Sequence, residues 1–167
     1  AASDVYKRQL EEVGNAVTHG IGAGLAIAGF VLLLLKSDTG LKVMASCFYG
    51  ISLILMFLMS CLYHSYKSGL AVKRLWRRFD YSSIYLLIGG TFAPLYLVYW
   101  GNVLGIVLFC VQWALIIVGI TIICVFGPGR FRPIHYTLYF VIGWSAIMFI
   151  PGWFRNCLLY TSPSPRD

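Results

Sequence analysis

Charged side chains are scarce in this sequence, and acidic ones are the scarcest. Only 6 of the 167 residues are Asp or Glu and 13 are Lys or Arg, so 11% of the chain is charged while 59% is hydrophobic. Soluble globular domains carry about 25% charged residues. The composition is therefore typical of a membrane protein rather than of a soluble domain.

Several signatures of other protein classes are also missing. The sequence has no glycine-rich phosphate loop, no GxSxG serine motif and no dinucleotide fingerprint. Its five cysteines show no CxxC spacing, and four of them fall in apolar stretches, where a thiol behaves as a small hydrophobic group. No cleavable signal peptide is visible, because the first apolar run follows a polar stretch and is too long.

What the sequence does contain is four long runs without Asp, Glu, Lys or Arg. They cover residues 13–35, 43–66, 81–129 and 133–154. Since a helix needs roughly 20 apolar residues to cross the hydrocarbon core, the third run must hold two helices, divided at residues 100–102. Lipid offers the backbone no hydrogen-bond partners and the alternation of a barrel strand is absent, so every span is predicted to be helical. The expected fold is an all-α, polytopic transmembrane helical bundle with five spans, at about 17–35, 43–62, 84–99, 103–126 and 136–150.

Basic residues near the predicted helix ends indicate how the chain is oriented across the membrane. Three of them flank one side of the spans, namely Lys36, Lys42 and Arg155. Nine flank the other side, namely Lys7, Arg8, Lys67, Lys73, Arg74, Arg77, Arg78, Arg130 and Arg132. Because positive charge accumulates on the cytoplasmic side, we expect a cytoplasmic N-terminus. The expected partners of these residues are membrane lipids and not nucleic acid, since the charges flank spans and form no separate basic domain.

The two ends of the chain differ in composition from the rest. Residues 1–9 and 157–167 resemble translated adapter sequence, so we expect both to be non-native tails. A single transmembrane domain is then expected over residues 10–156.

Two local features predict how the helices pack. Gly20 and Gly24 form a GxxxG step, which favours close helix packing within the chain. Pro94 removes a backbone hydrogen bond inside the third span and is expected to kink it.

Polar side chains occur at one end of each of the first three spans. Ionisable groups in a membrane are costly and are a functional-site hypothesis by default. On a helix, residues three or four apart share a face, so the polar side chains of one span point the same way. The set converges if the three spans are neighbours, and it comprises Glu12, Asn15, Thr18, His19, Ser60, His64 and Asp80.

The residues alone leave the chemistry of this set open. Imidazole, carboxylate and hydroxyl are the ingredients of a metal site that activates water, but catalytic zinc usually takes three protein ligands. His64 and Asp80 could equally form an interhelical pair. Asn15 and Thr18 could simply bond the helix backbone, with Glu12 as a cap at headgroup level.

Three ordered motifs resemble the bacterial hemolysin III family, within the progestin and adiponectin receptor superfamily. They are Glu12-x-x-Asn15-x-x-Thr18-His19, Ser60-x-x-x-His64, and Asp80-x-x-x-Ile84 leading to Gly90-Thr91-x-x-Pro94. The resemblance covers nearly all of residues 10–150. It implies a seven-span fold with the N-terminus inside, of which this chain would be a truncated fragment with five spans.

The resemblance also implies a site. A zinc ion in the cytoplasmic leaflet would be held by His64 and by two histidines of an HxxxH pair on the seventh span, with Ser60 and Asp80 acting on the zinc-bound water. This sequence has no HxxxH pair, and His135 is expected on the loop between the fourth and fifth spans. We therefore expect this chain alone to bind zinc weakly or not at all, and to be inactive.

The function implied for the intact protein is that of a zinc-dependent lipid hydrolase or a regulator of lipid homeostasis in the bacterial inner membrane. Glu12, Asn15, Thr18 and His19 would support the site. The alternative is a cytolytic or pore-forming protein without enzymatic activity. The sequence leaves the oligomeric state open.

Overall fold

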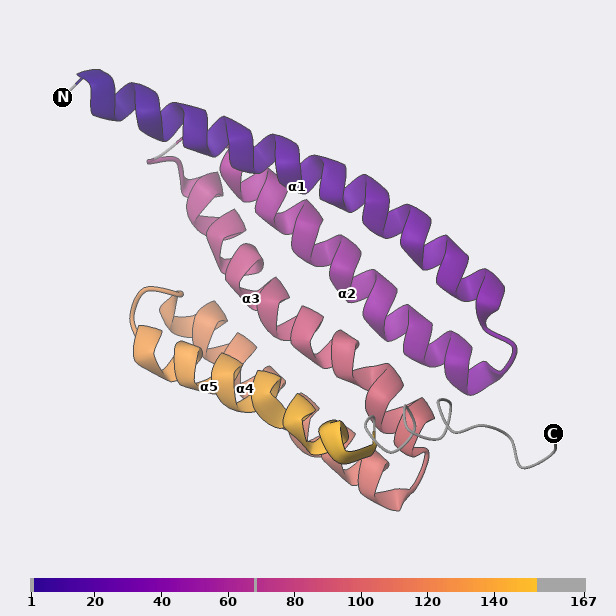
Figure 1. The fold of residues 1–167 in the computed structure, drawn as a ribbon. Coiled ribbons are helices and arrows are strands. Elements are labelled where there is room, and N and C mark those ends of the chain that lie inside the picture. The colour runs from indigo at the N-terminus through magenta and orange to yellow at the C-terminus, as the bar shows by residue number, and fades with distance from the viewer. Residues whose placement is uncertain (1, 68, 153–167) are drawn as a thin grey trace, which may run out of the picture.

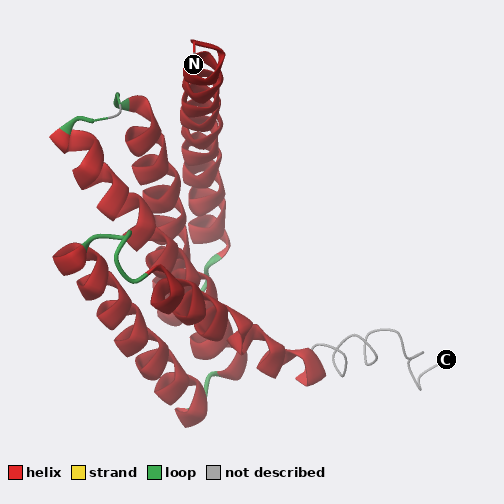
Figure 2. Ribbon diagram, turned by 90° about the vertical axis from the view of Figure 1, so that its left-hand side faces the viewer, coloured by secondary structure: helices red, strands yellow, loops and turns green. Residues whose placement is uncertain are grey.

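Helices make up almost all of the described chain. The computed structural model describes residues 2–67 and 69–152, with side chains from residue 6 onward. Within these ranges the elements are helical and joined by short loops (Figure 2). Five segments of the described chain are long and apolar enough to cross a membrane. The prediction of an all-α bundle with five candidate spans is confirmed.

The helices run beyond the apolar stretches at several ends. The elements are α1 (Ala2–Lys36), α2 (Gly40–Ser65), α3 (Ala71–Ala93), the π-helical η1 (Pro94–Trp100), α4 (Val103–Phe126), α5 (Arg132–Trp144) and the 3-10 helix η2 (Ser145–Phe149). α1 includes residues 2–9, whose non-native origin stays a prediction, and residues 157–167 lie outside the described part. α3 starts nine residues before Asp80, so this carboxylate lies within a helix.

The helices pack in chain order. α1 lies against α2, α2 against α3, and α4 and α5 lie on the other side of α3 (Figure 1). The first three helices are therefore neighbours, as convergence of their polar ends requires.

Glycines set the close contacts between α1 and α2. A Cβ added to Gly22 would lie 2.6 Å from the Phe57 ring, and one added to Gly50 would collide with Phe30. Gly24, in contrast, faces open space. Of the expected GxxxG step, only Gly20 packs against α2, where an added Cβ would lie 3.5 Å from Cys61 Sγ.

Pro94 changes the helix type in the third span. The α-helix ends at Ala93, and the backbone continues in a π-helix to Trp100. Gly101 then takes a positive φ of 54°, and the Asn102 side chain accepts a hydrogen bond from the Gly105 N–H at 2.9 Å to cap α4. The predicted division of the long apolar run at residues 100–102 is confirmed.

The buried core lies between α3, α4 and α5. One cluster contains Tyr85, Ile116, Ile123 and Ile142, and a second joins Phe92, Tyr96 and Phe149. In the most apolar 18-residue stretch of each span, 50% of the residues are buried for α3 with η1, against 17% or 22% for the other four spans. Many large apolar side chains of α1 and α2 are exposed, which suits surfaces that face hydrocarbon.

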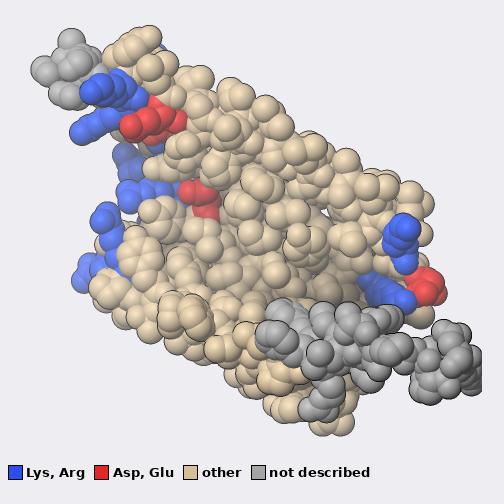
Figure 3. Space-filling view, viewed as in Figure 1, with Lys and Arg blue, Asp and Glu red and all other residues tan. Residues whose placement is uncertain are grey.

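Basic side chains gather at one end of the bundle (Figure 3). The start of α1, the connection from α2 to α3 and the connection from α4 to α5 meet there (Figure 1). Lys36 and Lys42 lie at the opposite end, and Arg155 lies outside the described residues. The grouping agrees with the sequence count, while its assignment to the cytoplasm stays a prediction.

Candidate functional site

A polar cluster joins α1, α2 and α3 at the basic end. Its centre is His64, whose Nδ1 lies 3.0 Å from Glu12 Oε2 across the contact between α1 and α2. Since a carboxylate oxygen accepts, Nδ1–H is the donor and the Nε2 lone pair of a neutral ring is left for another partner. A carboxylate holding the far nitrogen of a histidine is the arrangement that commonly orients metal ligands.

Lys73 of α3 completes the contact around Glu12. Its Nζ donates to the same Oε2 at 2.7 Å and lies 4.9 Å from the centre of the Tyr63 ring. The Lys73 side chain is only 9% exposed. Sequence reasoning missed this role because Lys73 counted there only as a topology charge. Its position nine residues after His64, at the start of the next helix, was the available signal.

Ser60 and Asp80 form the second part of the cluster. Ser60 of α2 is buried, and its hydroxyl lies close enough to the Asp80 carboxyl of α3 to interact with it. His64 and His19 act on the same carboxyl electrostatically. Imidazole, carboxylate and hydroxyl are thus brought together as the sequence predicted.

The remaining α1 residues divide into two groups. His19 faces the cluster, with its ring centre 6.1 Å from that of His64, and its Nδ1–H donates to the Asn15 carbonyl at 2.8 Å. Thr18 donates its hydroxyl to backbone carbonyls of its own helix, and both Thr18 and the Asn15 residue are exposed. The structure therefore brings His19 and Glu12 into the cluster, whereas Thr18 serves the helix backbone.

These side chains fit part of a zinc site. No group of three His, Cys, Asp or Glu positioned to hold a metal occurs in residues 2–67 and 69–152. A catalytic zinc usually needs three protein ligands, and what the chain supplies is one histidine with its Nδ1–H already fixed by a carboxylate.

His135 lies elsewhere than the sequence indicated. It is not on a loop but in the first turn of α5, where it is 1% exposed. Its Nδ1 lies 2.9 Å from the Tyr85 hydroxyl of α3. The expectation failed because α5 begins at Arg132, before the apolar run, and buries this ring against α3.

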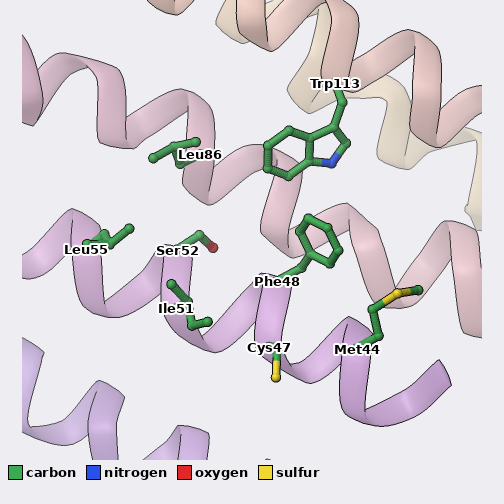
Figure 4. Close-up of a pocket in the computed structure, with 8 residues that line it drawn as sticks. All are labelled: Met44, Cys47, Phe48, Ile51, Ser52, Leu55, Leu86 and Trp113. Atoms are coloured by element: carbon green, nitrogen blue, oxygen red, sulfur yellow. The ribbon is translucent and has the colours of Figure 1, made fainter. Parts of the chain in front are cut away.

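An apolar groove of about 310 Å³ lies apart from the polar cluster. Figure 4 shows Phe48 of α2 and Trp113 of α4 facing each other there, with ring centres 5.3 Å apart. Its lining contains no Asp, Glu, His, Lys or Arg and is mostly apolar, which suits hydrocarbon. The lining residues are Met44, Cys47, Phe48, Ile51, Ser52, Leu55, Leu86 and Trp113.

Five candidate spans and a polar cluster at one end of the bundle define a multi-pass helical membrane protein. A family model described as "Haemolysin-III related" matches residues 7–163. The chain belongs to this family.

Two curated relatives support the assignment. "Hemolysin-3" of Bacillus cereus is 38% identical over 149 residues, which cover 87% of this chain and 67% of that protein. "Hemolysin-3 homolog" of Bacillus subtilis (strain 168) is 33% identical over 141 residues, covering 83% and 65%. The matched region thus spans about two thirds of each relative. No solved structure matches the chain significantly.

Proposed function

We propose that the intact protein is a zinc-dependent hydrolase acting on membrane lipids, and that it uses the cluster at the basic end of α1, α2 and α3. The observation that carries the proposal is the contact between His64 Nδ1 and Glu12, which leaves the Nε2 lone pair of an oriented ring to face a metal ion. The bacterial inner membrane, with this end in the cytoplasmic leaflet, is the proposed location.

The chain's own residues have distinct roles in this proposal. Glu12 holds His64 in one tautomer, and Lys73 balances the charge of Glu12. The Ser60 contact orients the Asp80 carboxyl, which can accept a proton from water. His19 adds a second imidazole beside His64, and Asn15 and Thr18 support this part of α1.

Zinc would supply Lewis-acid chemistry, since a bound zinc lowers the pKa of its water to about 7. His64 is the ligand that this chain offers. The other ligands would come from the intact protein, as the family resemblance implies. Regulation of lipid homeostasis would then follow from the lipid turnover.

The proposal is tested on the full-length protein purified in detergent. We expect about one zinc per protein by elemental analysis, loss of most of that zinc in His64→Ala, and retention in Thr18→Ala, whose exposed hydroxyl bonds only its own helix. Asp80→Asn should keep the metal and lose at least about 100-fold in fatty-acid release, the usual contribution of a general base. Metal-free wild-type protein, or zinc retained by His64→Ala, would refute the zinc role.

Cytolysis without catalysis is the second candidate. The name of the Bacillus cereus relative, "Hemolysin-3", favours it. Metal-free protein that releases dye from liposomes, with His64→Ala equally active, would support this alternative and contradict the hydrolase.

A further inference from the structure

Four cations lie in the first turns of α3, and three of them have an oxygen acceptor in the protein. Lys73 donates to the Glu12 carboxylate at 2.7 Å. Arg74 donates to a carbonyl of the preceding loop at 3.2 Å, and Arg78 donates to the last turn of α4 at 2.6 Å. The fourth cation is Arg77.

Arg77 differs from its neighbours in having no acceptor within residues 2–67 and 69–152. The residue is half-buried, and its Nε is a buried donor without a hydrogen-bond partner. The guanidinium carbon lies 5.7 Å from the centre of the Tyr81 ring. An aromatic face attracts the cation but accepts none of its N–H bonds in the plane of the fork. Because Nε is itself buried, a ligand would reach the guanidinium through its two terminal Nη groups.

The position of Arg77 indicates what would bind these Nη groups. The neighbouring Trp76 and Phe79 rings lie 5.5 Å apart at the basic end of the third span, and such rings prefer the membrane–water interface. Lipid phosphates lie at this depth. Guanidinium binds phosphate with two parallel hydrogen bonds, which a lysine cannot reproduce.

We propose that Arg77 binds the phosphate of an anionic phospholipid. The lipid is the occupant rather than free phosphate, because Arg77 belongs to a membrane-spanning segment beside the bilayer's own phosphates. This binding is independent of hydrolysis and goes beyond the proposed function.

A lipid held by Arg77 lies next to the polar cluster. Arg77 and Asp80 are three residues apart on α3 and therefore share a face. The Tyr63 hydroxyl of α2 is influenced by the charges of both. A phosphate bound by Arg77 would therefore lie on the same face of α3 as Asp80.

The test measures lipid affinity of the full chain in detergent by native mass spectrometry, with phosphatidylglycerol as the probe. We expect Arg77→Gln to weaken phosphatidylglycerol binding about tenfold or more, the size expected for lost charge-assisted hydrogen bonds. Arg74→Gln is the matched control, since it removes the same charge one turn earlier, and it should change the affinity less than threefold. Arg77→Lys, which keeps the charge and the fold, should also weaken binding because it lacks the fork.

Four results would overturn the proposal. Equal losses in Arg77→Gln and Arg74→Gln would show a general charge effect. Unchanged binding in Arg77→Lys would contradict a phosphate site that depends on two parallel hydrogen bonds from the guanidinium. Equal affinity for phosphatidylcholine would contradict a preference for anionic lipid. Competition by millimolar inorganic phosphate would show that the site binds the free anion. None of these results depends on zinc content or hydrolysis, so the failure of this proposal is separate from that of the proposed function.

Discussion

Among single side chains, Glu12 accepts two charge-assisted hydrogen bonds in the cluster. One of its oxygens accepts from both His64 and Lys73, which come from two different helices. The side chain is 33% exposed while Lys73 is 9% exposed, so its loss leaves the more deeply buried charge unpaired. Such a loss costs more than the loss of an exposed pair.

We expect Glu12→Gln to lower the free energy of unfolding by about 1–3 kcal/mol, discounted for the partial exposure of Glu12. Thermal unfolding in detergent measures the change. If Glu12→Gln and Lys73→Met together cost the sum of their separate effects, the two residues are not coupled, and the described ion pair has no energetic role.

Asp38→Asn is the matched control. Asp38 forms a fully exposed ion pair with Lys42 at 2.7 Å, and the hydrogen bond from Lys42 lowers the pKa of Asp38. A lowered pKa means that the pair stabilises the fold above the ordinary pKa of Asp and that this contribution is lost as the pH falls through the lowered value. At neutral pH the exposed pair is worth little, so Asp38→Asn should leave stability nearly unchanged.

Most residues of the site could be predicted from residue types and spacing, whereas their contacts across helices became clear only from the structure. Ser60, His64 and Asp80 were recognisable because polar groups at the ends of apolar runs stand out. The tautomer of His64 was not predictable, since it depends on a partner 52 positions away. Lys73 was overlooked because a basic residue beside a span already has an explanation in topology.

Between helices, the contact of α2 with α3 depends on Gly90. A Cβ at this position would collide with the Ser52 hydroxyl oxygen and lie close to the Phe48 carbonyl. Ser60 and Asp80 face each other across the same pair of helices. Widening the pair at Gly90 therefore also separates the polar side chains.

Gly90→Ala is expected to destabilise the protein by about 1–3 kcal/mol through overpacking. Gly29→Ala is its control, because a Cβ there meets nothing within 4 Å, and it should be neutral or stabilising by up to about 1 kcal/mol. Thermal unfolding of the two variants in the same detergent compares them. Equal stabilities would mean that α2 and α3 adjust without strain.

The number of spans could be predicted from the sequence, whereas the contacts between the helices could not. Apolar length sets the number of helices, so five were expected and five are found. Which glycine meets a neighbour depends on helix rotation. Gly20 and Gly24 matched a packing motif, yet Gly22 and Gly50 make the close contacts with aromatic rings.

For the bundle as a whole, the open prediction is its direction in the membrane. Basic residues are in excess at the end of the bundle that carries Lys67. We therefore expect this end to face the cytoplasm and the end with Asp38 to face outward. In intact cells, a membrane-impermeant maleimide should label Asp38→Cys and leave Lys67→Cys unlabelled until the cells are opened. The reverse pattern would invert the orientation and move the polar cluster to the outer leaflet.

The third span has an unusual combination of properties. Half of its most apolar stretch is buried inside the protein, and it carries Lys73, Asp80 and the buried Ser82 and Ser83. A segment of this composition gains less from hydrocarbon than its neighbours do. Its polar groups find partners on α1, α2, α4 and α5. The stability of the third span in the bilayer therefore depends on its contacts with the other helices. During biogenesis the third span should settle only when the fourth has emerged to shield it, which makes membrane insertion and folding one event for this part of the chain.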